Sequence, residues 1–181
     1  MHSSLFPAAL VVLCSVACGQ QAVPSAGKDV PASQDRQAGR SGQTAPSPYV
    51  PVTKYDAVRD PAVDLQNAVA EATRTGKRIL LEVGGEWCVW CHTMDAYFDE
   101  HPTLLERREQ KFVTVKINFS EENENKTFLS QYPKIPGFPH IFVLESSGAF
   151  LHSQGTGELE SGKSYDLDRF SGFLKRWEPT S

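Results

Sequence analysis

Two cysteines separated by two residues are the strongest chemical signal in this sequence. Cys88 and Cys91 enclose Val89 and Trp90, and an apolar stretch of strand length, Ile79–Val83, precedes them with a Gly-Gly turn between. If a helix begins near Cys88, one helical turn holds both sulfurs close enough to form and break a disulfide. The helix N-terminus would also stabilise a Cys88 thiolate, the species that attacks disulfides. We therefore interpret the segment as a redox centre.

Three other functions are compatible with the same residues. Cys88, Cys91 and His92 satisfy the Cys-x-x-Cys-His motif that attaches c-type haem. Zinc could be held by these side chains together with His101, although a second Cys pair is missing. A redox-inert binding domain would need neither cysteine. Met94 lies too near His92 in sequence to ligate the opposite face of a haem iron, so we expect no metal and no cofactor beyond a Cys88–Cys91 disulfide.

The other two cysteines lie in an N-terminal segment that resembles a secretion signal. Leu5–Ala17 is apolar, carries no formal charge and is too short to be a permanent membrane span. The small residues before Cys18 are typical of a bacterial lipoprotein signal, so residues 1–18 are expected to be a signal peptide and Cys18 to be lipidated. Ordinary cleavage nearby is the alternative. We expect a protein of the periplasm or cell envelope, anchored by lipid, or else a secreted one.

A low-complexity segment separates this signal from the folded domain. Residues 19–53 are rich in Pro, Gly, Gln, Ser and Ala and contain one aromatic residue, Tyr49. Such a segment cannot bury enough apolar surface to fold, so a flexible tether is predicted, followed by a domain at residues 54–181.

The chain has 18 basic and 22 acidic residues, and this ordinary charge balance gives no indication of nucleic-acid binding. We expect a monomer.

Hydrophobic periodicity and capping residues predict alternating helices and strands in this domain. Asp60 and Pro61 can begin a helix that Gly76 ends. Its expected apolar face comprises Val63, Leu65, Val69 and Ala72. The other expected elements are strands at Ile79–Val83 and Phe112–Ile117, helices from Cys88 to Phe98, after Pro102 and at Glu121–Tyr132, a hairpin of His140–Leu144 with Ala149–His152, and a closing helix at Tyr165–Trp177. This order implies an α/β fold with a central mixed sheet and helices on both faces.

The chain resembles the thioredoxin-fold family over about residues 60–178. Two motifs carry the resemblance: Trp87-Cys88-x-x-Cys91 after a strand, and Ile135-Pro136-Gly137-Phe138-Pro139 before the predicted hairpin. Within this family, the chain resembles exported thioredoxin-like domains, such as the C-terminal domain of the transmembrane thiol:disulfide interchange reductase. The resemblance implies a thioredoxin-like three-layer α/β/α fold, a cis-proline at Pro139 beside the sulfurs, and a substrate-pairing position at Phe138. Trp87 and Trp90 are expected at the rim as substrate contacts.

Further residues are assigned by their position in the family. Glu82 stands where thioredoxins keep a buried acid that accepts a proton as the second cysteine becomes a thiolate. A carboxylate in an apolar strand should have a raised pKa, as a base for a thiol requires. Lys116 matches the lysine that pairs with this carboxylate. Gly84 replaces a common aromatic residue, a change expected to alter the rim of the site and the choice of partner.

Together these features predict an exported thiol–disulfide oxidoreductase. Cys88 attacks a partner disulfide, and Cys91 resolves the mixed disulfide to release a reduced partner. Neither Val89 nor Trp90 donates a strong hydrogen bond to a Cys88 thiolate, which predicts a reducing to intermediate potential, below roughly −200 mV. Such a protein would accept electrons from a membrane reductase and pass them to exported proteins or to thiol–disulfide relay proteins.

Overall fold

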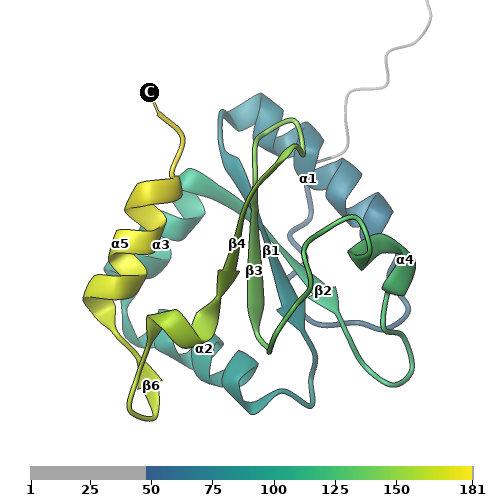
Figure 1. Cartoon of the computed structure of the whole chain (residues 1–181). Coiled ribbons are helices and arrows are strands. Elements are labelled where there is room, and N and C mark those ends of the chain that lie inside the picture. The colour runs from purple at the N-terminus through teal and green to yellow at the C-terminus, as the bar shows by residue number, and fades with distance from the viewer. Residues whose placement is uncertain (1–47, 181) are drawn as a thin grey trace, which may run out of the picture. The chain divides into compact units, whose positions relative to one another are not determined.

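The computed structural model describes residues 48–180, which form a sheet flanked by helices (Figure 1). The elements in chain order are α1 (Pro61–Thr75), β1 (Arg78–Gly84), α2 (Val89–Glu100), α3 (Pro102–Lys111), β2 (Phe112–Asn118), α4 (Lys126–Leu129), β3 (His140–Leu144), β4 (Phe150–Gly155), a 3-10 helix η1 (Thr156–Leu159), β5 (Glu160–Ser161), β6 (Ser164–Tyr165) and α5 (Leu167–Trp177). The expected signal peptide, the lipidation site Cys18 and most of the expected tether lie outside the described residues.

Four strands form the central sheet in the order β2-β1-β3-β4. β1 pairs in parallel with β2 and antiparallel with β3, and β3 pairs antiparallel with β4. The sheet is therefore mixed, as predicted. In this register Glu82 of β1 lies opposite Lys116 of β2 and Ile141 of β3. A separate hairpin, β5–β6, is absent from the sequence prediction.

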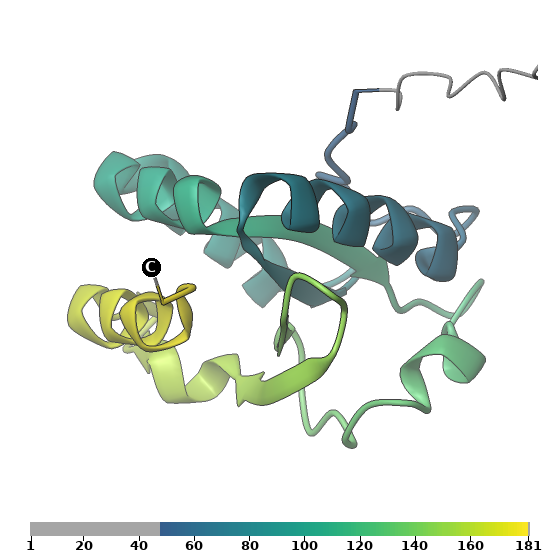
Figure 2. The ribbon, with the colours of Figure 1, turned by 90° about the horizontal axis from the view of Figure 1, so that it is seen from above.

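Helices cover both faces of the sheet, which confirms the predicted three-layer α/β/α fold. Figures 1 and 2 show α1 and α5 on opposite sides of the sheet. Side chains alternate along β1, so Leu81 packs with Ala72 of α1 whereas Leu80 packs with Phe170 of α5. By the same alternation Glu82 faces the layer that contains α2, α3 and α5.

Polar side chains cap the N-termini of helices α1 and α5. The Asp60 carboxylate accepts a hydrogen bond from Ala62 N at 2.8 Å, and Gly76 takes the left-handed conformation with φ of 69° at the other end. Helix α1 therefore has the predicted bounds. In α5 the Asp166 carboxylate is the N-cap, so the helix begins after Tyr165, which instead belongs to β6.

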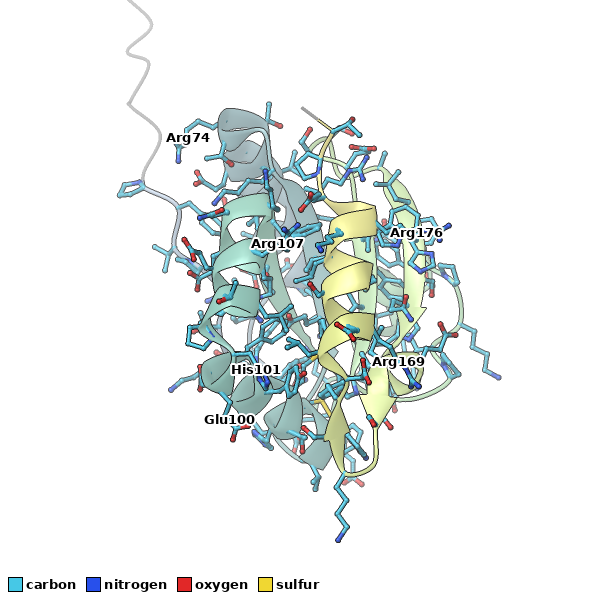
Figure 3. All side chains as sticks on the ribbon, turned by 90° about the vertical axis from the view of Figure 1, so that its left-hand side faces the viewer. Arg74, Glu100, His101, Arg107, Arg169 and Arg176 are labelled. Carbon is cyan, nitrogen blue, oxygen red and sulfur yellow. A yellow bond between two sulfur atoms is a disulfide. The ribbon has the colours of Figure 1, made fainter. Side chains whose placement is uncertain are left out.

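Helices α3 and α5 lie side by side on the outer surface of their layer (Figure 3). Arg107 of α3 forms an ion pair with Glu178, just after α5, with 2.7 Å between Nη1 and Oε2. Arg78 at the start of β1 donates a hydrogen bond to the carbonyl oxygen of Trp177 at 3.1 Å. The C-terminal helix is thereby joined to both α3 and the sheet.

The segment 121–132 differs most from the prediction, because only Lys126–Leu129 is helical. Asn125 has a φ of 48°, which interrupts any longer helix. Asn118 Nδ2 donates to the carbonyl oxygen of Asn123 at 2.9 Å, and Asn125 Nδ2 donates to that of Asn118 at 2.7 Å. These side-chain amides supply bonds that a helix would make between backbone groups, and so they stabilise a loop.

Two smaller expectations about the start of the domain are also corrected. Val63 is 50% exposed, because the buried stripe of α1 runs through Ala68 and Ala72. The fold begins before residue 54, since Val52 is buried and forms a parallel bridge with Val115 of β2.

In the described part of the chain, no helix has both the length and the apolar character needed to cross a membrane.

Candidate active site

The Cys88–Cys91 disulfide lies at the N-terminus of α2, where the sequence predicts it. The two Cα atoms are 5.2 Å apart. Cys88 is the N-cap residue, and its sulfur accepts a hydrogen bond from Cys91 N at 3.2 Å. Unpaired N–H groups and the helix dipole favour negative charge at this end of a helix. Cys88 is 3% exposed and Cys91 is fully covered, so Cys88 is the more accessible of the two residues.

An aromatic wall, made of Trp87, Phe119 and Phe138, borders the disulfide. The Phe138–Pro139 peptide bond is cis, as the family resemblance implies. The Phe138 ring stacks on Phe119 with centroids 4.7 Å apart and meets Trp87 edge-on at 5.6 Å. Trp87 is 56% exposed, and its indole Nε1 donates a hydrogen bond to the carbonyl oxygen of Phe119 at 2.6 Å. The wall is thus a partly exposed apolar surface held in a fixed orientation.

Gly84 is buried beneath the disulfide, and its effect on the rim and on the choice of partner stays a prediction. A Cβ atom at this position would overlap Cys91 Sγ and would lie 3.0 Å from Tyr55 Oη. Tyr55 is 5% exposed and forms a small apolar cluster with Cys88 and Cys91. The lack of a side chain at Gly84 is therefore what allows Tyr55 and Cys91 to share this space.

Glu82 is completely buried, two residues before Gly84 and on the same face of β1. Its Oε1 accepts a hydrogen bond from Arg108 Nη1 at 3.3 Å, and its Oε2 has no partner within residues 48–180. Burial raises the pKa of Glu82 above its ordinary value, against the lowering effect of the positive charges of Arg108 and Lys116. A hollow of about 590 Å³ borders Glu82, although the carboxyl group itself has no accessible surface. These properties are those of a carboxylate that can accept a proton from a thiol.

Lys116 does not form the expected ion pair with Glu82, although the two residues are register partners. Its Nζ donates to both carboxylate oxygens of Asp95 on α2, at 2.6 and 2.5 Å. The same ammonium group lies 4.7 Å from the centre of the Tyr55 ring. The long lysine side chain reaches past the sheet to α2, and among the described residues the cation paired with Glu82 is Arg108 of α3. Lys116 acts on Glu82 only through its charge at longer range.

The remaining predicted residues lie around the two cysteines. The Trp90 ring is half-buried and meets Tyr165 of β6 edge-on at 5.7 Å, and it also packs against the cluster that contains the two cysteines. His92 is exposed, with its Nε2 2.8 Å from the carbonyl oxygen of Glu86. The two cysteines, which the haem and zinc alternatives would also use, are bonded to each other here. Within residues 48–180, no three His, Cys, Asp or Glu side chains are grouped to hold a metal ion.

Three residues of the site are missing from the sequence prediction: Tyr55, Asp95 and Arg108. Asp95 lies four residues after Cys91, one helical turn away, so helical spacing could have indicated it. Tyr55 and Arg108 approach the site from the segment before α1 and from α3. Their positions depend on tertiary packing, and no local sequence signal identifies them.

Comparison with known proteins agrees with this geometry. Residues 60–146 match a family model described as Thioredoxin-like. The thiol:disulfide interchange protein DsbD of Pseudomonas fluorescens is 30% identical over 134 residues, which are 71% of this chain and 21% of that protein. DsbD of another Pseudomonas species is 27% identical over 128 residues, 70% of this chain and 20% of that protein. The chain thus matches about a fifth of the length of these relatives.

Solved structures show the same fold. A disulphide isomerase from Xylella fastidiosa has a TM-score of 0.58 and 25% identity, covering 67% of this chain and 94% of that chain. The oxidised C-terminal domain of Neisseria meningitidis DsbD has a TM-score of 0.50 and 21% identity, covering 69% of this chain and 99% of that domain. The shared fold and the Cys-x-x-Cys disulfide support thiol–disulfide oxidoreductase chemistry. This chain therefore contains a thioredoxin-like domain, similar to the C-terminal domain of the thiol:disulfide interchange protein DsbD.

Proposed function

We propose that this protein is an exported thiol–disulfide oxidoreductase that reduces disulfides of other exported proteins. One observation carries the proposal: a Cys-x-x-Cys disulfide at a helix N-terminus, with Cys88 slightly more accessible than Cys91, which is buried above Gly84. The similarity to DsbD, an interchange protein by name, supports it.

The proposed reaction has two exchange steps. The Cys88 thiolate attacks one sulfur of a partner disulfide, and the other partner sulfur leaves as a thiolate and takes up a proton. Cys91 then loses its proton and attacks Cys88 Sγ, and the bound partner sulfur leaves and is protonated in turn. Two electrons pass to the partner, and the Cys88–Cys91 disulfide is the product. We assign the Cys91 proton to Glu82, whose buried carboxyl group has a raised pKa.

The substrate would lie along the aromatic wall and the cis-proline. A groove of about 360 Å³ is bordered by Phe138, Pro139 and the turn after β4. An extended peptide in this groove could pair with the backbone before Pro139 while Trp87 contacts its side chains. Trp90 also packs against the cluster that contains the two cysteines.

The direction of the reaction follows from how the Cys88 sulfur is stabilised. Within the described residues, its one hydrogen-bond donor is the Cys91 backbone N–H, since Val89 is 75% exposed and Trp90 packs on Tyr165. Strong oxidants stabilise this thiolate heavily and have potentials near about −120 mV, so we expect a value below roughly −200 mV. Equilibration with glutathione buffers measures it, and a value at the oxidant end would contradict the assignment as a reductase.

Export and anchoring complete the proposal. The relatives named DsbD support a place in the periplasm or cell envelope and a membrane reductase as the electron donor. If Cys18 is lipidated, labelled fatty acid should enter the wild-type protein and should be absent from Cys18→Ala. A soluble, unlabelled mature protein beginning near Cys18 would contradict the anchor and leave a secreted form.

Cysteine variants test the chemistry directly. Cys88→Ser should abolish the reduction of insulin, because no thiolate remains to attack. Cys91→Ser should accumulate mixed disulfides through Cys88, which mass spectrometry detects. If Cys88→Ser keeps its activity and Cys91→Ser traps nothing, the exchange mechanism is wrong.

A further inference from the structure

The hydroxyl group of Tyr55 is buried beside the disulfide without a hydrogen-bond partner. Tyr55 is 5% exposed, and its Oη has neither a donor nor an acceptor among the described residues. A buried hydroxyl group without a partner costs about 1–3 kcal/mol, so such groups are rare and call for an explanation. The function proposed above uses Cys88, Cys91 and Glu82 but leaves this hydroxyl group without a role.

The position of the hydroxyl group points to Cys91. A Cβ on Gly84 would overlap Cys91 Sγ and would lie 3.0 Å from Tyr55 Oη, so both atoms converge on one point above Gly84. Tyr55, Cys88 and Cys91 also form one apolar cluster. In the oxidised protein the Cys91 sulfur is bonded to Cys88 and is only a weak acceptor. When the disulfide opens, the same sulfur can become a thiolate, which accepts hydrogen bonds strongly.

We propose that Tyr55 donates a hydrogen bond to the Cys91 thiolate as this thiolate forms during the resolving step. The inference rests on the proposed function, because it concerns a step of that reaction. Tyr55 acts only as a hydrogen-bond donor: no covalent bond to it forms, and its proton stays on the phenol oxygen. The Cys91 proton passes to Glu82, the Cys91–Cys88 bond forms, and the bond from Cys88 to the partner sulfur breaks.

The charges around Cys91 make a neutral donor useful. Glu82 from β1, Glu86 from the loop before α2 and Asp95 from α2 bring negative charge to Tyr55, which lies in the same cluster as Cys91. Negative charge at this place opposes the formation of a thiolate. Lys116 from β2 is already paired with Asp95. His92 lies farther out, beside Glu86. Burial first, and then the charges of Glu82 and Asp95, raise the pKa of Tyr55 well above its usual range, so the phenol keeps the proton that it donates.

Tyr55→Phe removes only the hydroxyl group, and Tyr49→Phe is its matched control. Tyr49 also has a buried hydroxyl group without a partner in the described part of the chain, but it packs on the α1 side of the sheet. Stopped-flow tryptophan fluorescence of the reduced protein with a model peptide disulfide separates the two steps. The observed rate rises with peptide concentration, and its initial slope reports attack by Cys88. The limiting rate at high peptide concentration reports resolution by Cys91.

For Tyr55→Phe we expect the limiting rate at neutral pH to fall about tenfold and its pH profile to move to higher pH, as loss of one hydrogen bond to a thiolate predicts. The attack rate and the Tyr49→Phe protein should stay within about twofold of wild type. Incorporation of 3-fluorotyrosine at position 55, a stronger donor, should move the profile to lower pH and needs no change of packing.

Three outcomes would overturn the inference. The first is an unchanged pH profile in both position-55 proteins. The second is an equal slowing of both steps in Tyr55→Phe without a shift in the profile, which a purely structural role would produce. The third is a profile that moves to higher pH with 3-fluorotyrosine. Failure of the proposed function is a separate result, because the wild-type protein would then form no mixed disulfide with the peptide at all.

Discussion

Gly84→Ala is the substitution that tests the packing beneath the disulfide most directly. The added Cβ would overlap Cys91 Sγ and would approach Tyr55 Oη to 3.0 Å, so at least one of these side chains must move. Overpacking of a well-filled core by one methyl group destabilises a protein by roughly 1–3 kcal/mol. Gly84 has no positive φ, so the backbone itself would accept alanine and the cost comes from crowding alone.

The cost should depend on the redox state. In the oxidised protein the disulfide fixes Cys91 Sγ against the new methyl group, whereas in the reduced protein Cys91 can adopt another rotamer. Gly84→Ala should therefore destabilise the oxidised form more than the reduced form. If the whole cost of roughly 1–3 kcal/mol falls on the oxidised form, the reduction potential rises by about 20–60 mV, since about 1.4 kcal/mol corresponds to 30 mV for two electrons.

Urea unfolding of both redox forms and equilibration with glutathione measure these effects. Gly172→Ala is the control, because Gly172 lies in α5, is exposed, and has open space where an added Cβ would lie. That substitution should stabilise both forms by about 1 kcal/mol through helix propensity, without a change in potential. The reasoning would be refuted if oxidised Gly84→Ala were as stable as wild type, or if its potential were unchanged or lower.

Three further substitutions test other parts of the site. Glu82→Gln should slow resolution by roughly a hundredfold, because it removes the base. Burial raises the pKa of Glu82 in the folded protein above 4.5, so the stability of the wild-type protein should fall as pH rises through that pKa. Urea titrations of the variant should lack this fall. Burial lowers the pKa of His140 to about 4, so the unfolded chain binds a proton more readily than the folded one. Stability should therefore fall as pH drops from about 6.5 to 4. The free energy of unfolding of His140→Leu should depend less steeply on pH in this range, and an equal dependence would contradict the assignment. Phe138→Ala removes the centre of the aromatic wall and should raise KM for a peptide disulfide about tenfold or more with less effect on kcat; an unchanged KM would mean that peptides bind elsewhere.

Local sequence patterns account for most of the fold. Asp60, Pro61 and Gly76 define α1 because caps act through neighbouring backbone groups. Period-two apolar patterns and strand-length runs locate β1, β2 and β3 for a similar reason. The pattern failed in residues 121–132, where asparagine side chains compete for backbone hydrogen bonds and stabilise a loop. A prediction from hydrophobic periodicity uses only the positions of apolar residues, so it does not detect side chains that compete for backbone hydrogen bonds.

The site was predictable where the motif itself contains the chemistry. Cys88, Cys91 and Pro139 occupy the expected places, and Glu82 has the buried environment expected for a base. The partner of Lys116 was not predictable, because strand register brings it beside Glu82 while the packing of α2 offers Asp95 instead. Such a choice between two carboxylates depends on side-chain reach in three dimensions.

The short stretch before α1 has a consequence for where this domain can be cut. Val52 bridges β2, Lys116 N donates a hydrogen bond to the carbonyl oxygen of Val52 at 3.2 Å, and Tyr55 covers Cys91. A truncated protein that began at residue 60, where the family match begins, would keep both cysteines and every strand of the sheet. It would nevertheless open the underside of the disulfide to water and leave the edge of β2 bare. The smallest autonomous unit of this enzyme therefore includes residues that lie before its recognisable family domain.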